Sequence, residues 1–235
     1  MPRMRSRLLP LIVPLLAVAS VACNKASEAP VATQDQKVAA PTSPAPTTTS
    51  EAVSPVAQLG HAAPDFTLSD TDGKAVTLSS LKGKIVVLEW FNADCPFVKR
   101  SHTQGTLKGY GNEASSRGDV VWLAINSSAE GKQGAGLPRN KEARSQYAMT
   151  YPVLMDTTGS VGRQFGARTT PHMFVIDRAG NLTYSGAIDN APDGDPRDTP
   201  TVVNFVHAAL EDLRAGKPVA KPKTDPWGCG VKYKS

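Results

Sequence analysis

IVVLEWFNADCPFVK, residues 85–99, is the stretch of sequence that decides the fold. Its first seven residues are apolar except for Glu89, which is the pattern of a central strand buried on both faces. A short loop follows, then Cys95, and then Pro96 at the first turn of a helix. The sulfur of Cys95 is thereby placed at a helix N-terminus, where free backbone N–H groups and the helix dipole stabilise thiolate over thiol. We therefore predict that Cys95 is a nucleophile.

Strands and helices alternate through the rest of the domain. The sequence predicts a hairpin of residues 65–68 and 75–78, and further strands at 120–125, 151–154, 173–176 and 182–185. Helices are expected from Cys95 to before Gly118, from Pro138 to about Met149, over residues 160–165, and from about Thr201 onward. This alternation predicts an α/β fold, a three-layer α/β/α sandwich around a central mixed sheet.

The N-terminus has the pattern of a secretory leader. Three arginines precede an apolar run from Leu8 to Val21, which is too short to cross a bilayer as a helix. Small residues then lead into Cys23, and residues 19–23 resemble the processing site of bacterial lipoproteins, at which the cysteine is lipidated. The alternative is ordinary cleavage that leaves an unmodified thiol. We expect a signal peptide over residues 1–22 and a lipid anchor on Cys23.

Composition divides the remaining chain into three parts. Residues 23–57 are rich in Ala, Pro and Thr and have few large apolar side chains, which predicts a disordered tether. Residues 58–216 have the size of one domain, and residues 217–235 form a Pro- and Lys-containing tail that can fold back over it. Removing the leader takes away three arginines and lowers the formal charge from +5 to +2, so no nucleic-acid partner is expected.

The chain resembles a known family at two places. The Cys-Pro-Phe-Val-Lys run at 95–99 is similar to the thioredoxin active site, and residues 167–176 are similar to the loop and strand that carry the cis-proline of that fold. Together with Gly228-Cys229-Gly230-Val231-Lys232-Tyr233, these motifs resemble the peroxiredoxin-like group of the redoxin or alkyl hydroperoxide reductase/thiol-specific antioxidant superfamily. The resemblance implies a thioredoxin-like fold.

The same resemblance implies roles for several residues. Thr170-Pro171 would be a cis peptide that, with Pro96, positions the substrate. Glu89 lies six residues before Cys95, the spacing at which thioredoxins hold a buried carboxylate as a proton shuttle. Burial would favour the protonated carboxyl and suit it to general acid/base catalysis. The alternative places Glu89 at a strand edge, facing solvent or a lysine.

The chain departs from its relatives at two positions near the nucleophile. Asn92 stands where peroxiredoxins have a threonine three residues before their reactive cysteine, which weighs against efficient peroxide reduction. That cysteine also aligns with the second cysteine of the thioredoxin pair, whereas Cys95 occupies the first position and Val98 the second. A local disulfide within the 95–98 motif is therefore excluded.

Cys229 is then the one remaining thiol that could resolve an intermediate on Cys95, if Cys23 is consumed by lipidation. Three interpretations stay open: a reversible Cys95–Cys229 disulfide, a permanent staple of the tail, and two unpaired thiols. The lipoprotein-like processing site at residues 19–23 and Asn24 favour a location in the bacterial cell envelope, facing the periplasm. The outer membrane is preferred over the inner.

Two classes of function follow. The first is an exported thiol oxidoreductase, without a cofactor, acting on protein thiols and disulfides or on hydroperoxides and regenerated by a thiol reductant. The second is a non-enzymatic module of the same fold that binds copper or a partner protein. Thiolate and imidazole ligands suit copper. The candidate ligand set is Cys95, His102, His172 and Cys229.

Overall fold

The computed structural model describes residues 56–192, 197, 199 and 201–235. The predicted leader, the lipidation site Cys23 and nearly all of the predicted tether lie outside these residues. Within the part of the chain that is described, no helix has both the length and the apolar character needed to cross a bilayer.

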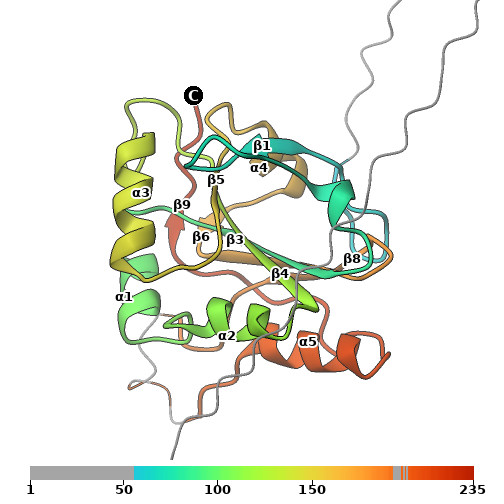
Figure 1. The fold of residues 1–235 in the computed structure, drawn as a ribbon. Coiled ribbons are helices and arrows are strands. Elements are labelled where there is room, and N and C mark those ends of the chain that lie inside the picture. The colour runs from blue at the N-terminus through green and yellow to red at the C-terminus, as the bar shows by residue number, and fades with distance from the viewer. Residues whose placement is uncertain (1–55, 193–196, 198, 200) are drawn as a thin grey trace, which may run out of the picture. The chain divides into compact units, whose positions relative to one another are not determined.

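A mixed five-stranded sheet forms the centre of the domain (Figure 1), with strand order β5-β4-β3-β7-β8. Strands β3 (Ile85–Trp90), β4 (Val120–Asn126) and β5 (Val153–Met155) run parallel. Strands β7 (His172–Ile176) and β8 (Leu182–Gly186) complete the sheet as antiparallel neighbours. The central strand β3 is buried along its whole length, as its apolar run predicted.

Alternation along β3 divides the core into two layers. Ile85 and Val87 face one cluster, to which helices α1 (Pro96–Thr103), α2 (Tyr110–Ser116), α3 (Leu137–Gln146) and α5 (Phe205–Arg214) contribute side chains. Val86, Leu88 and Trp90 face the other cluster. That cluster is closed by α4 (Ser160–Phe165), the 3-10 helix η1 (Leu78–Leu81) and the hairpin of β1 (Thr67–Ser69) and β2 (Ala75–Thr77). The predicted α/β/α sandwich is confirmed.

Three predicted helices have different bounds, and one of them, expected from Pro138 to about Met149, is α3 (Leu137–Gln146). The helix expected from Cys95 to before Gly118 is two helices, α1 and α2, separated by a turn that contains Gly105 and Gly109. Gly109 has a positive φ of 72°, which a helix interior does not allow. The last helix begins at Phe205 rather than near Thr201, because the Asn204 side chain caps it by accepting a hydrogen bond from the His207 N–H (2.8 Å).

The chain after α5 returns across the end of the sheet. The backbone N–H of Ser185 in β8 donates to the carbonyl of Pro222, and the short strand β9 (Cys229–Gly230) pairs antiparallel with β6 (Thr169–Thr170). In this pairing Cys229 lies opposite Thr170. The end of the tail therefore runs beside β6 (Figure 1), and the pairing brings Cys229 to Thr170.

Candidate functional site

Cys95 is the N-cap residue of α1, directly after the loop that follows β3. Its backbone is extended, with φ −74° and ψ 122°, and Pro96 at the start of the helix fixes the first turn. Its carbonyl accepts the N–H of Lys99 (2.9 Å), so the side chain stands at the helix N-terminus. The side chain is completely buried, with an exposed fraction of 0%. The thiol reaches the Thr170 carbonyl oxygen at 3.1 Å and donates to it.

The loop opposite Cys95 carries the expected cis peptide. The Thr170–Pro171 bond is cis, as the resemblance to the thioredoxin fold implied, and both residues are buried. Thr170 ends β6, and Pro171 separates it from β7, which pairs with β3 in the sheet. Pro96, the third residue with a predicted positioning role, is exposed on the first turn of α1.

Cys229 is the second thiol of the site. Its Sγ lies 2.7 Å from that of Cys95, although 134 residues separate the two in sequence, and both are free thiols in the structure. Cys229 is partly exposed, in contrast to Cys95. Burial, followed by the hydrogen bond and charge interaction with Cys95, raises the pKa of the Cys229 thiol to about 11. Cys229 therefore keeps its proton at neutral pH.

Specific contacts on both sides of Cys229 hold the tail in place. Before it, the Trp227 indole N–H donates to the Asp189 carbonyl (3.1 Å), and its ring lies 6.4 Å from that of Phe97. After it, the Tyr233 hydroxyl donates to the Ala167 carbonyl (2.8 Å), and the Arg163 guanidinium lies over the Tyr233 ring. Cys229 is thereby fixed between two aromatic anchors.

Glu89 is a buried carboxylate on the α1 side of β3, with an exposed fraction of 0%. The alternative of a solvent-facing strand edge is wrong. Its Oε1 lies 2.7 Å from Nε2 of His102, and its Oε2 accepts the Trp122 indole N–H at 2.9 Å and the Tyr151 hydroxyl at 3.4 Å. Burial, then the Glu89 charge, raises the pKa of Tyr151 well above its ordinary value, so this phenol stays a hydrogen-bond donor.

The histidines of the copper hypothesis do not converge on the two sulfurs. His102 is paired with Glu89, and His172 is buried on the opposite side of the sheet, with its ring 4.4 Å from that of Phe174. Its Nδ1 accepts the Arg168 N–H at 3.2 Å. Among the residues described, no group of three or more His, Cys, Asp or Glu side chains is placed to hold a metal ion. The four-residue ligand set is therefore wrong.

A clamp on the loop before Cys95 was not predicted from the sequence. Arg139 on α3 donates from Nε to Asp94 Oδ1 (2.7 Å) and from a terminal nitrogen to the Ala93 carbonyl (2.9 Å). The Asn92 amide donates to the Ser128 hydroxyl (3.2 Å) and to the Gln133 carbonyl (3.0 Å). These side chains fix the loop that positions Cys95. Pro138 marked the start of a helix in the sequence, but nothing there placed Arg139 beside Asp94.

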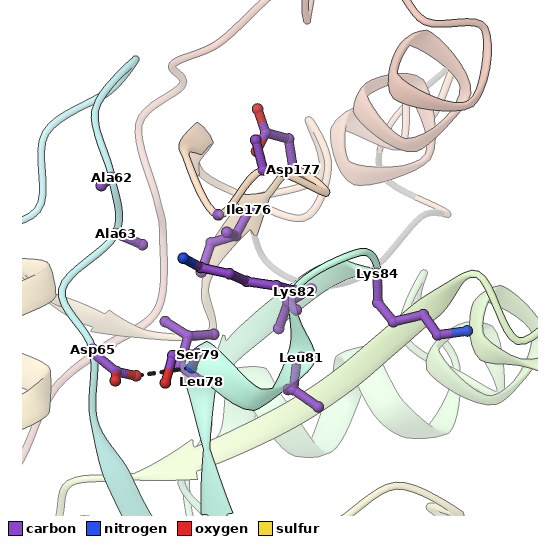
Figure 2. Close-up of a pocket in the computed structure, with 13 residues that line it drawn as sticks. Ala62, Ala63, Asp65, Leu78, Ser79, Leu81, Lys82, Lys84, Ile176 and Asp177 are labelled. Carbon is purple, nitrogen blue, oxygen red and sulfur yellow. Dashed lines mark hydrogen bonds between the residues drawn. The ribbon is translucent and has the colours of Figure 1, made fainter.

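A cavity of about 270 Å³ lies away from this site, next to Val86 near the beginning of β3 (Figure 2). Leu78, Leu81 and Ile176 form part of its apolar lining, and Lys82 extends across it. Asp65, at its edge, accepts the backbone N–H of Ser79 at 2.8 Å. Neither cysteine lines this cavity, so its contents would not meet the thiols.

Comparisons with known proteins concern the family and the fold. The Redoxin family profile matches residues 58–203. The chain is 31% identical over 134 residues to the chloroplastic peroxiredoxin Q of Oryza sativa subsp. japonica, covering 53% of this chain and 57% of the rice protein. It is 25% identical over 132 residues to the thiol-disulfide oxidoreductase ResA of Bacillus thuringiensis subsp. konkukian, covering 53% of this chain and 67% of that protein. The chain thus spans little more than half the length of its rice relative.

Two solved structures have the same fold over most of their length. A hypothetical protein of Sinorhizobium meliloti 1021 superposes with a TM-score of 0.66 at 27% identity, covering 76% of this chain and 96% of that one. An uncharacterized conserved protein of Geobacillus kaustophilus superposes with the same TM-score at 29% identity, covering 75% and 93%. With a thioredoxin-like fold, a cysteine at the N-terminus of α1 and a family match over residues 58–203, the chain belongs to the redoxin family.

Proposed function

We propose that this protein is a thiol oxidoreductase that cycles between a Cys95, Cys229 dithiol and a Cys95–Cys229 disulfide. The observation that carries the proposal is the 2.7 Å separation of the two sulfurs at the N-terminus of α1. A helix N-terminus favours the thiolate, which is the nucleophilic form of cysteine. A pair of thiols held in contact can give two electrons to a substrate disulfide by thiol–disulfide exchange, without a cofactor.

In the proposed cycle, the Cys95 thiolate attacks one sulfur of a substrate disulfide and expels the other as a thiolate. The Cys229 thiol then loses its proton and attacks the Cys95 sulfur of the mixed disulfide. This step releases the second substrate thiolate and leaves a Cys95–Cys229 disulfide, so the substrate gains two electrons and the pair loses two. Because Cys95 is fully buried, the tail around Cys229 moves aside before a substrate reaches it.

The substrate class that we favour is a disulfide rather than a hydroperoxide. The relatives include both a peroxiredoxin Q and the thiol-disulfide oxidoreductase ResA, so family membership alone does not decide between the two substrate classes. Asn92 occupies the position of the peroxiredoxin threonine, and its amide is already engaged by Ser128 and the Gln133 carbonyl. A peroxide would find no threonine hydroxyl there.

Proton transfer is assigned to Glu89, together with its partner His102. The hydrogen bonds of Glu89 go to His102, Trp122 and Tyr151 rather than to either sulfur. His102 is on α1, the helix that Cys95 caps, and stacks on the Tyr147 ring at 5.1 Å. The buried pair would accept the proton that the resolving thiol loses.

The reduction potential of the pair tests the proposal. The protein is equilibrated in glutathione or dithiothreitol buffers of graded potential, and the free thiols are trapped and counted, with Cys95→Ser and Cys229→Ser as controls. A potential between about −120 and −270 mV supports an oxidoreductase. A potential well below about −300 mV would identify a permanent staple of the tail instead. If no disulfide forms in any buffer, the two-cysteine cycle is wrong.

We also propose that the domain acts in the bacterial cell envelope, facing the periplasm, as a lipid-anchored protein. The proposal rests on the leader pattern of residues 1–22 and on Cys23 within a lipobox-like sequence. Labelled fatty acid should be incorporated into the full chain in a bacterial host and be absent from Cys23→Ser. Equal labelling of the two chains, or none of either, would contradict the anchor.

A further inference from the structure

The two sulfurs differ in how easily a partner can reach them. Cys95 has an exposed fraction of 0%, with the Thr170 carbonyl against its thiol on one side and the Cys229 sulfur on another. Cys229 is partly exposed, and its neighbour Gly230 is exposed. In the closed arrangement of the tail, an incoming thiol meets Cys229 first.

The two sulfurs also differ as leaving groups. A disulfide breaks faster when the expelled thiolate is the more stable one. Attack on Cys229 expels Cys95, which caps α1 and faces the positive end of the helix dipole. Attack on Cys95 would expel Cys229, whose pKa is raised to about 11 by burial and by Cys95, so its thiolate is disfavoured. Exposure selects Cys229, and the helix N-terminus at Cys95 favours the same direction of attack, although the complete burial of Cys95 works against its thiolate.

We propose that the electron donor of this protein is a thiol that attacks the sulfur of Cys229, forming its mixed disulfide there and expelling Cys95. This assignment rests on the proposed two-cysteine cycle and gives Cys229 a second role, as the entry point for electrons. The donor thiolate forms a bond to the Cys229 sulfur, and the Cys95–Cys229 bond breaks with its electron pair on Cys95. A second donor thiol then attacks the donor sulfur, and Cys229 leaves and takes up a proton.

The charge near Cys229 suits an anionic donor. Lys232 lies close enough for its charge to lower the pKa of the Cys229 thiol, against the larger effect of burial. The same charge attracts an approaching thiolate, whose charge is negative. Lys234, two residues further, is exposed and is not among the main influences on the pKa of the Cys229 thiol, so it supplies a control.

The first arm of the test locates the mixed disulfide. The full chain carrying Cys23→Ser is oxidised, and its mass is checked for the loss of two hydrogens. It is then mixed with glutathione, quenched in acid within the first turnover, labelled with a maleimide and mapped by peptide mass. We expect glutathione on Cys229 and the maleimide on Cys95. Glutathione on Cys95, or equally on both, would overturn the proposal.

The second arm gives a result even when the mixed disulfide does not accumulate. The rate of disulfide reduction by glutathione, an anionic thiol, is measured for Lys232→Glu and Lys234→Glu. We expect Lys232→Glu to slow reduction by about threefold or more and Lys234→Glu to leave it unchanged. Equal effects of the two substitutions, or no effect of either, would overturn the proposal. A chain that forms no disulfide in the mass check would instead refute the proposed cycle.

Discussion

At the scale of single residues, Gly228 sets the position of the Cys229 sulfur. Its φ of 129° is a conformation that residues with a Cβ rarely adopt, and a Cβ there would collide with the Thr170 carbonyl. We predict that Gly228→Ala pushes the tail away from β6 and slows the second step of disulfide formation, the attack of Cys229 on the mixed disulfide at Cys95, by about tenfold or more, which is about 1.4 kcal/mol. The rate is measured with oxidised glutathione, by trapping free thiols over time.

Gly230 provides the matched control for this prediction. It lies in β9, two residues after Gly228, but it is exposed, and a Cβ there would meet nothing within 4 Å. Gly230→Ala should form the disulfide at the wild-type rate. Equal rates for Gly228→Ala and the wild type would show that the tail is not held by this close approach.

Individual contacts of the site could be predicted from the sequence only where local spacing fixed them. The position of Cys95 follows from a strand, a short loop and Pro96, and a glutamate within an apolar run pointed to a buried carboxylate. The partner of that carboxylate could not be predicted, because His102 meets it through packing of α1 on the sheet. The Arg139 contact with Asp94 joins residues 45 apart and likewise depends on the fold.

At the scale of elements, the Glu89–His102 pair joins β3 to α1. If this pair moves the proton of the exchange reaction, Glu89→Gln should slow disulfide formation about 10²-fold at pH 7. At pH 9 more of the thiol is already deprotonated by solvent, so the variant should approach the wild-type rate. The measurement is the rate of oxidation by oxidised glutathione at the two pH values.

His102→Gln provides a second variant of the same pair, in case Glu89→Gln does not fold. A purely structural role would lower the rate by the same factor at both pH values in either variant. Loss of the link between β3 and α1 would displace the sulfurs to the same extent at either pH. That result would show that the pair does not transfer the proton and only links β3 to α1.

The bounds of helices and strands could be predicted where a residue in the sequence marks the end of the element. Helix α4 ends at Phe165, and its C-cap Gly166 is left-handed with φ 64°, as the glycine after residues 160–165 indicated. The α1–α2 break was harder to place, because three glycines each weaken a helix without showing where it stops. The return of the tail to β6 depends on pairing between segments about 60 residues apart, which local patterns do not encode.

At the scale of the whole molecule, acid should unfold the domain partly through His172. Burial, then the Arg168 charge, lowers the pKa of His172 from 6.5 to about 3. Between these values the unfolded chain binds a proton that the folded protein does not. The stabilising contribution of neutral His172 is therefore present above pH 6.5 and is lost as the pH falls toward 3.

We predict that the free energy of unfolding falls by about 2 kcal/mol more in the wild type than in His172→Gln between pH 6.5 and pH 4.5. The comparison of the two chains cancels other titrating groups, including the Glu89–His102 pair on the opposite side of the sheet. Urea unfolding at the two pH values measures the difference. Equal losses of unfolding free energy in the two chains would mean that His172 takes up its proton in the folded state. Such uptake requires water to reach the ring between Arg168 and Ser185.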